Sequence, residues 1–402
     1  MKIVLKILEI ISKTVACIIV LAILAVAATS FSPVYRFRAP VPFSGPDIFN
    51  PYSQLDSGNC WKRANFHTHT RVEGLLNECD YWPAEVYAVL ERLGYDIVTF
   101  SNHNELTEHP FDPDLHVSVY EHGYNLLKYH KLVFGTEAVQ HFDHILPLFA
   151  FQKQFQINRL SEDAELIQIN HPLRTPTLSD SQLEKLGGYR LIELDSGRST
   201  ENRYWDKALS AGHYCFGVAN DDLHYPDRSS RTAVRCNFLC CRSAQWPDIR
   251  ECLLNGCFYS MRVPDYGNGD WNIKHEKNKS VPYIRSIGLN DSTIFISLSS
   301  PADSIKVIGQ DHTRLKISCN EAGLEYTMSK EDSYARIIAY FSEGEVIYTN
   351  PFARYDSSVC ESPFNDPTPD VSILMTLLFN LALLLVCIGC TYTMYLILKK
   401  RK

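Results

Sequence analysis

Two charge-free apolar segments near the ends of this chain constrain its fold more than any other feature. The first covers residues 14–31 and the second covers residues 371–398. About 20 consecutive apolar residues suffice to cross the hydrocarbon core of a bilayer, so each segment is long enough for a transmembrane helix. A cleaved signal peptide is the alternative for the first segment, because Ala25, Val26 and Ala27 resemble a cleavage site.

Basic residues beside the two segments predict an orientation in the membrane. Three lysines lie within residues 1–13, and four basic residues, 399–402, follow the second segment directly, as in a stop-transfer sequence. Basic flanks mark the cytoplasmic side, although Arg36 and Arg38 blur the signal. We therefore predict an integral membrane protein with both termini in the cytoplasm and residues 32–370 outside it. A bacterial cytoplasmic membrane with a periplasmic domain is the favoured setting.

Charge and cysteine content exclude two classes of function. The formal net charge is −7 although both ends are positive, so the middle is acidic and would repel a polyanion. Tight nucleic-acid binding is therefore not expected. Of the 13 cysteines, Cys17, Cys387 and Cys390 lie in the apolar end segments, and the others form no paired CxxC spacing, which argues against a structural zinc finger. Disulfides outside the cytoplasm and buried reduced thiols both remain open.

Between residues 61 and 270, short apolar runs that read as strands are followed by His, Glu or Asp. The strands and their polar residues are 62–66 with His67 and His69, 95–100 with His103, 131–134 with Glu137, 166–170 with His171, 190–194 with Asp195, and 214–219 with Asp222 and His224; a further strand is predicted at 142–146, with His144. Alternation along a strand places His67 and His69 on one face. Helical stretches at 82–94, 180–186 and 201–211 separate some of these strands. Ligands at strand ends are typical of an α/β barrel active site.

The motifs NFHTHT, SNHN, GTEA, HIL, NHP and DDLH, in this order, resemble those of the PHP (polymerase and histidinol phosphatase) family over residues 62–262. Members of that family form a distorted seven-stranded (β/α) barrel and hold two or three Zn, Mn or Fe ions. The resemblance implies these metal ligands: His67, His69, His103, Glu137, His144, His171, Asp222 and His224. Glu73 is the nearest candidate for a further ligand after the first motif, at an imperfect spacing. Asn65 and Asn102 stand where Asp is common in the family.

The same resemblance implies hydrolysis of phosphate esters. Imidazole and carboxylate ligands suit Zn, Mn or Fe, and clustered cations turn water into a hydroxide nucleophile while holding phosphate oxygens. Arg174, Arg198 and Arg228 follow strand-end motifs and are candidates for binding phosphate as a bidentate fork. Asp195 and His213 are candidates for proton transfer. The expected substrate is a phosphorylated small molecule or a component of the cell envelope, with the bilayer as a second partner.

Three alternatives remain open at this point. An amidohydrolase-like barrel also begins with HxH, but bridges its metals with a modified lysine, and no strand here ends in Lys. A non-catalytic, metal-stabilised membrane receptor or scaffold is also compatible with the anchors. A polymerase-associated domain is opposed by the apolar segments.

Residues 281–355 change to short alternating runs separated by turn residues, which predict a C-terminal β-sandwich. The predicted order is a cytoplasmic N-terminus, a transmembrane helix, a linker, a PHP-like hydrolase domain, a β-sandwich, a second transmembrane helix and a basic tail, at 1–13, 14–31, 32–60, 61–270, 281–355, 371–398 and 399–402.

Overall fold

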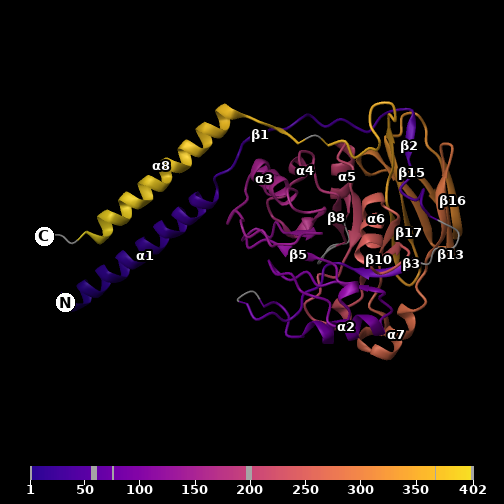
Figure 1. Cartoon of the computed structure of the whole chain (residues 1–402), viewed down its shortest axis with the longest axis horizontal. Helices are drawn as coiled ribbons and strands as arrows, with labels where there is room; N and C mark the ends of the chain where they lie inside the picture. Colours follow the sequence, from indigo (N-terminus) through magenta and orange to yellow (C-terminus); the bar gives the residue numbers. More distant parts are fainter. Residues whose placement is uncertain (1, 56–60, 75–76, 196–201, 367, 400–402) are drawn as a thin grey trace.

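The computed structural model describes residues 2–55, 61–74, 77–195, 202–366 and 368–399. It shows a mixed α/β body and two long helices that extend from it side by side (Figure 1). The helices are α1 (Lys2–Thr29) and α8 (Ile373–Leu398). By length and composition both could cross a membrane, with a mean hydropathy of 2.6 for each and almost no burial inside the protein.

The helix pair leaves the body through a short two-stranded sheet. Strand β1 (Tyr35–Arg36) pairs antiparallel with β20 (Asp370–Val371), so the chain enters and leaves the body at one place. The backbone of Val34 adds hydrogen bonds to Ser372 and to the Thr376 hydroxyl, of 2.8 and 2.9 Å. The two helices therefore run antiparallel, and both chain ends lie at the same end of the molecule (Figure 1).

A five-stranded sheet forms one side of the body. Its order is β5-β6-β7-β8-β9, with bounds Val119–His122, Lys131–Phe134, Leu166–Ile169, Leu191–Leu194 and Phe216–Ala219. Strands β7, β8 and β9 run parallel, whereas β6 is antiparallel to both β5 and β7. Every residue of these five strands is buried, which agrees with their apolar composition.

A ten-stranded sheet forms the other side. Its main path is β15-β14-β17-β18-β11-β10-β3-β4, with bounds Thr313–Ser318, Ser304–Gly309, Tyr334–Tyr340, Val346–Thr349, Phe258–Arg262, Arg235–Cys240, Trp61–Asn65 and Ile97–Val98; β19 (Phe352–Tyr355) pairs with β17 and with β2 (Asp47–Phe49). The pairing of β11 with β18, as in Ser260↔Tyr348, joins strands from the predicted hydrolase domain and the predicted sandwich in one sheet.

A three-stranded sheet packs against the part of the large sheet formed by β14 and its neighbours. It consists of β12 (Ile284–Asn290), β13 (Thr293–Ala302) and β16 (Glu321–Thr327). Ile294, Ile296, Val307 and Ile337 are buried between the two layers and belong to one hydrophobic core. The alternating pattern of residues 281–355 thus produces two facing sheets, one of which continues into the rest of the body.

Short helices cover the sheets and connect the strands. They are α2 (Pro83–Arg92), α3 (Ala150–Leu160), α4 (Asp180–Leu183), α5 (Arg203–Ser210), α6 (Trp246–Asn255) and α7 (Trp271–Asn278), with 3₁₀ turns at Pro113–Leu115, Pro172–Arg174, Ser229–Arg231, Tyr266–Gly269 and Gln310–His312. Helix α2 begins with a proline, and Glu85 accepts a hydrogen bond from the Trp82 backbone at 2.8 Å. Both features are typical of a helix N-terminus.

Two local predictions differ from the structure. The strand expected at 142–146 is a loop that leads into α3, and it belongs to none of the sheets in the described residues. The chain before β6 was not expected to form a strand, but Val119–His122 forms β5 and pairs with β6 as an antiparallel hairpin. This hairpin determines which side chains reach the site described below.

A buried ion cluster ties the large sheet to α5. Arg336 of β17 donates from Nε and Nη2 to the two carboxylate oxygens of Asp206, at 2.8 and 2.5 Å. Tyr334 and His312 also contact this carboxylate, at 2.9 and 2.6 Å. We call these four residues the Asp206 cluster.

Candidate metal centre

The two histidines of the first motif lie just beyond β3, between the two large sheets. The backbone of this segment pairs with the segment after β9: His69 N donates to Leu223 O at 2.9 Å, and Leu223 N donates to His67 O at 3.2 Å. This pairing places Asp222 directly beside both imidazoles. A parallel bridge between His103 and Glu121 brings in the end of β5 from the other side.

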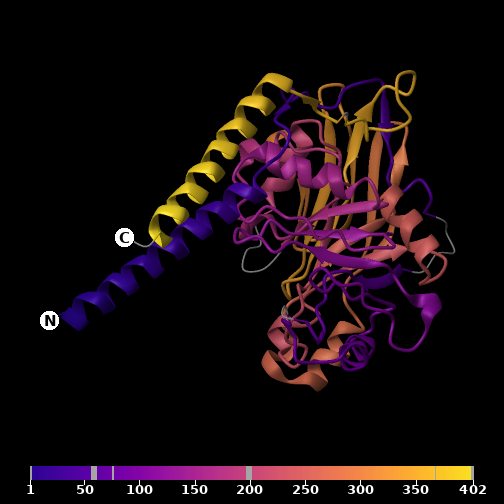
Figure 2. The same ribbon diagram turned by 60° about the vertical axis from the view of Figure 1, so that its left-hand side comes forward.

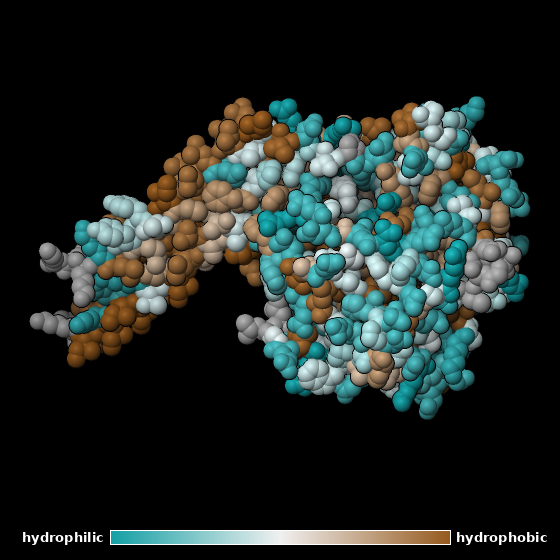
Figure 3. Space-filling view, viewed as in Figure 1, coloured by the Kyte–Doolittle hydropathy of each residue, from teal (hydrophilic) through white to brown (hydrophobic). Residues whose placement is uncertain are grey.

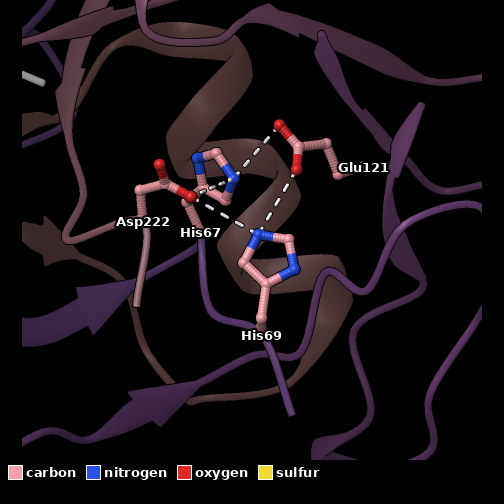
Figure 4. Close-up of side chains that lie close together, drawn as sticks. All are labelled: His67, His69, Glu121 and Asp222. Carbon is pink, nitrogen blue, oxygen red and sulfur yellow. Dashed lines mark ion pairs between the residues drawn. The ribbon is translucent and has the colours of Figure 1, made fainter. Parts of the chain in front are cut away.

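Four of these residues form a compact group that we call the central cluster: His67, His69, Glu121 and Asp222 (Figure 4). His67 Nε2 lies 3.2 Å from Glu121 Oε1 and 3.2 Å from Asp222 Oδ1. His69 Nε2 lies 3.3 Å from Glu121 Oε2 and 3.4 Å from Asp222 Oδ1. All four side chains are buried, yet both Nε2 atoms lack a hydrogen-bond partner.

The spacing of these atoms fits a cation. Ligand atoms at about 2.1 Å from a tetrahedrally coordinated ion lie about 3.4 Å from one another. The observed nitrogen–oxygen separations of 3.2 to 3.4 Å match that value. Buried polar atoms rarely stay unpaired, and a shared ion would satisfy both imidazole nitrogens and both carboxylates. The residues present therefore fit a divalent metal.

Glu121 connects the central cluster to further potential ligands. Its Oε2 lies 3.1 Å from His103 Nε2, and its Oε1 lies 3.3 Å from both His130 Nδ1 and His171 Nε2. Ligand-capable atoms also gather in two overlapping groups, His69 with Glu78 and His103, and His103 with Glu121 and His130. The arrangement offers places for more than one cation, with Glu121 shared between them.

A second layer of polar residues fixes the ligands. Glu193 of β8 accepts at 3.0 Å from His67 Nδ1, so that His67 presents Nε2 to the cluster. The His171 backbone N–H donates to the other Glu193 oxygen at 2.7 Å. Asp221 accepts from three successive backbone N–H groups, 233–235, and anchors the loop that carries Asp222. Carboxylate–histidine pairs of this kind orient the imidazole in many metal sites.

The electrostatics of the central cluster favour a bound cation. Burial disfavours a charged His67, but Glu121, Asp222 and Glu193 outweigh that effect and raise its pKa well above the ordinary value. Burial likewise opposes ionisation of Glu121 and Asp222, yet the surrounding histidines hold both carboxyl pKa values well below normal. Without a metal, imidazole protons balance the carboxylates, and a divalent ion would replace those protons.

The structure brings most of the sequence-predicted ligands together. His67, His69, His103, His171 and Asp222 all lie in or beside the central cluster. The His224 ring lies 4.3 Å from that of His69, and its Nε2 is 3.2 Å from Glu78 Oε2. Among the predicted phosphate-binding residues, Arg174 contacts Asp222 through Nη1 with its side chain about one-third exposed to solvent.

Three predicted ligands lie elsewhere. Glu73 and Glu137 are exposed, and neither belongs to a group of ligand-capable atoms in the described residues. His144 is buried, and its Nδ1 hydrogen-bonds to the backbone oxygen of Thr29 at the end of α1. Glu121, which lies beside five histidines, occupies the place of the carboxylate ligand that the resemblance assigned to Glu137.

The reason is the direction of β6. In a sheet of parallel strands, the C-terminal ends of all strands share one edge, which would place Glu137 at the site. Because β6 is antiparallel to β5 and β7, its beginning lies at the edge where those strands end. His130, just before β6, therefore reaches the site, and Glu137, beyond its other end, does not.

The other predicted residues lie apart from the cluster or outside the described residues. Arg198 lies outside them. Arg228 is exposed, with its guanidinium 4.2 Å from the centre of the Tyr225 ring. Burial raises the pKa of Asp195 to about 6, and its carboxylate lies 3.7 Å from Arg262 Nε. His213 precedes β9, at the end opposite Asp222, and bonds to Asp366 at 2.8 Å.

Comparisons with known proteins add little to this description. No family model matches the chain, and no curated protein matches it. Among solved structures, the chain is similar to a two-domain protein from Bacteroides vulgatus ATCC 8482 that contains a predicted PHP-like metal-dependent phosphoesterase. The identity is 15%, the match covers 78% of this chain and 99% of that one, and the TM-score is 0.38. A TM-score this low carries no argument about fold or function, so the case for a metal centre rests on the residues themselves.

Proposed function

We propose that this protein is a membrane-anchored, metal-dependent phosphoesterase that cleaves phosphate esters outside the cytoplasm. The observation that carries the proposal is the central cluster, with two buried imidazole nitrogens that lack partners at metal-ligand spacing from two carboxylates. The order of the PHP-like motifs along the sequence supports the same reaction. A distorted PHP-type barrel is the corresponding proposal for the fold, supported by the His103–Glu121 bridge that links the segment after β4 to β5, and so one large sheet to the other.

Two or three divalent ions, Zn, Mn or Fe, would activate water and neutralise phosphate oxygens when bound. The central cluster would hold one ion, and His103, His130, His171 and Glu78 offer ligands for others. Mixed imidazole and carboxylate donors suit these metals better than Mg or Ca, which prefer oxygen alone.

The remaining roles fall to residues of the chain around the cluster. Arg174 lies at the solvent side of Asp222, where its guanidinium can bind the non-bridging oxygens of a phosphate. Glu193 keeps His67 in the tautomer that offers Nε2 to the cluster. Glu78 and His224 form a half-exposed pair, 3.2 Å apart, that can carry a proton between the site and solvent.

The helix pair supports the membrane setting. Its antiparallel arrangement places both chain ends on one side, as the basic flanks predict for cytoplasmic termini. The body, at the other end of the pair, would then lie outside the cytoplasm, in a bacterial cell in the periplasm.

The amidohydrolase alternative receives no support from the lysine nearest the site. Lys131 is buried, and its Nζ donates to Tyr129 O and Gln156 Oε1 at 2.9 and 2.7 Å. Since Glu121 occupies the central position, a modified lysine is not needed to bridge two ions.

The test uses the full chain purified in detergent. Metal content per chain would be measured by elemental analysis, together with hydrolysis of a generic phosphate monoester and diester under Zn, Mn and Fe. We expect at least one tightly bound metal, and a His67→Ala/His69→Ala variant that loses metal and turnover to the background level. A His141→Ala/His275→Ala variant, which removes two histidines outside the site, is the matched control.

Each other outcome has a defined meaning. Metal bound without turnover under all three ions would replace the phosphoesterase by the receptor or scaffold alternative. If the wild-type and control chains are folded but bind no metal, the metal centre itself is refuted.

A further inference from the structure

Five large apolar side chains are exposed on one flank of the body, in segments that lie next to one another. They are Tyr124, Leu126, Leu148, Phe149 and Leu173, with exposed fractions from 44% to 73%. Hydrogen bonds connect the three segments that carry them: Leu126 N to Ile145 O at 3.1 Å, Thr175 Oγ1 to Lys128 O at 2.7 Å, and Thr177 Oγ1 to Pro147 O at 3.3 Å. We call these five side chains the flank patch.

The flank patch is continuous with the apolar helix pair. The loop before α3 meets the end of α1 through His144 and through Ile145, whose backbone N–H donates to the Thr29 hydroxyl at 3.3 Å. In addition, the rings of Phe149 and Phe151 lie 6.2 and 5.0 Å from that of Phe379 in α8. In Figures 1 and 2 the flank with α3 is the side of the body nearest the two helices.

The contact with Phe379 fixes the depth of this loop along α8. Phe379 follows the first residue of the helix, Ile373, by six positions, which is about 9 Å along the helix axis. Phe149 and Phe151 therefore lie beside the second turn of the apolar helix and not above its beginning. Hydrophobic surface covers the helix pair as far as its junction with the body in Figure 3. If α8 spans a bilayer, the tip of this loop lies within the same apolar layer.

The flank patch also borders the candidate metal centre. Leu173 lies in the turn Pro172–Arg174, between His171, which contacts Glu121, and Arg174, which contacts Asp222. Tyr124 follows β5 closely, and β5 carries Glu121 itself. The segments that carry the patch are thus the ones that carry ligands and the candidate phosphate-binding arginine.

We propose that the flank patch inserts into the outer surface of the bilayer, so that the metal centre acts on phosphate esters of membrane lipids. This inference rests on the phosphoesterase proposed above and adds the substrate class. The exposed Lys128 and the partly exposed Arg174 place positive charge beside the patch, which suits an anionic lipid headgroup. Apolar side chains at the rim, next to cations and an active site, are the features that an interfacial enzyme needs.

The first experiment measures insertion without reference to activity. The full chain would be reconstituted in phosphatidylcholine vesicles with and without brominated acyl chains, carrying Leu126→Trp or, as control, Ile317→Trp. Ile317 is 42% exposed on β15, on the side of the body away from the helices. We expect brominated lipid to quench the added fluorescence of Leu126→Trp and to leave that of Ile317→Trp unchanged.

Two results would overturn insertion. The first is that brominated lipid fails to quench Leu126→Trp while aqueous iodide does, which would place the patch in water. The second is protection from both quenchers, which would mean that a protein surface or a second copy of the chain covers the patch.

The second experiment measures substrate class in the same vesicles. Rates would be compared for phosphatidic acid and for a water-soluble phosphate monoester, in wild type, in Leu126→Ser/Phe149→Ser and in the control Ile317→Ser/Ile273→Ser. We expect the patch variant to lower the lipid rate at least about tenfold, or ~1.4 kcal/mol, with the soluble rate unchanged. Phe149 precedes α3 at its N-cap, where Ser is favourable, so this change should not unfold the helix.

The lipid-substrate assignment and the phosphoesterase activity can fail separately in these experiments. Equal effects of the patch and control variants, or hydrolysis of the soluble ester alone, would overturn the lipid assignment and leave the phosphoesterase standing. Hydrolysis of neither substrate by a metal-loaded chain would refute the phosphoesterase itself, although quenching of Leu126→Trp would still establish insertion.

Discussion

The body contains two buried clusters of charged side chains, and they differ in how their polar atoms are paired. In the Asp206 cluster, both carboxylate oxygens accept from Arg336, Tyr334 and His312 at 2.5 to 2.9 Å. In the central cluster, the Nε2 atoms of His67 and His69 lie 3.2 to 3.4 Å from oxygens of Glu121 and Asp222 and form no hydrogen bonds with them. The side chains of both clusters are buried except for that of His312, which is 24% exposed.

The difference separates an ion pair that holds the fold together from one that is arranged for a ligand. Direct hydrogen bonds compensate the cost of burying charge, and in the Asp206 cluster both carboxylate oxygens are paired, although Arg336 Nη1 has no hydrogen-bond partner. In the central cluster, both Nε2 atoms lack hydrogen bonds and lie at separations from the carboxylate oxygens that fit a shared ion. The Asp206 cluster sets one carboxylate against a guanidinium that donates two hydrogen bonds to it, whereas the central cluster sets two carboxylates beside two imidazoles whose Nε2 atoms are unpaired.

The largest effect on stability is expected from a substitution in the Asp206 cluster. Asp206→Ala leaves the Arg336 guanidinium buried without its partner, and we expect the free energy of unfolding to fall by about 3–5 kcal/mol. Chemical denaturation would measure the loss. Glu343→Ala, which removes an exposed partner of Lys277, should cost no more than about 1 kcal/mol. If the folded Asp206→Ala chain also lost its metal, the two clusters would not be independent.

Metal removal should have the next largest effect, and only at the central cluster. With free metal at about one hundred times its dissociation constant, a bound ion adds about 2.7 kcal/mol to the free energy of unfolding. A chelator should therefore lower the melting temperature of the wild type. In the His67→Ala/His69→Ala variant the chelator should have no effect, and an equal shift in both would contradict the site.

Glu193→Gln tests whether the hydrogen bond from His67 to Glu193 contributes to metal binding. The substitution keeps the shape of the side chain but removes the charge that orients His67. We expect metal affinity to fall about 10- to 100-fold, measured by competition with a chromogenic chelator. The matched change Glu165→Gln, at an exposed pair with Arg250, should leave the affinity unchanged. Unaltered affinity in Glu193→Gln would show that the His67 contact is only structural.

The smallest effect is a pH dependence of the Asp206 cluster. Burial opposes ionisation of Asp206, but Arg336 outweighs it and holds the carboxyl pKa below its ordinary value of 3.8. A lowered pKa stabilises the fold above the unfolded pKa, and this contribution is lost as pH falls through the folded value. Below about pH 4, wild-type stability should therefore fall more steeply than that of Asp206→Asn. Parallel denaturation curves across pH for the two would contradict this assignment.

The sequence predicts the elements of the body better than their directions. Apolar runs marked β6, β7, β8 and β9 to within about two residues, because buried strands leave a strong compositional signal. Nothing in such a run states whether it is parallel or antiparallel to its neighbours. Because β6 is antiparallel to its neighbours, the carboxylate at the site is Glu121 and not the predicted Glu137.

A local signal for Glu121 exists, although it is weak. The residue follows Val119 and Tyr120, which favour a strand, and a carboxylate in a buried strand needs a partner. Glu193 gives the same indication, because it lies inside the apolar run LIEL. Glu78 gives less, since its role depends on contacts with His103 and His224 that are distant in sequence. The histidine motifs could be found because HxH and strand-end histidines are short-range patterns.

The pairing of β1 with β20 has a mechanical consequence. Two unpaired connections between a body and a pair of helices could each stretch and rotate independently. Here Tyr35 and Val371 lie in register, and the Val34 backbone bonds to Thr376 in α8, so the two connections form one stiff hinge. A tilt of either helix would turn the body as a unit, and the flank patch would move with it.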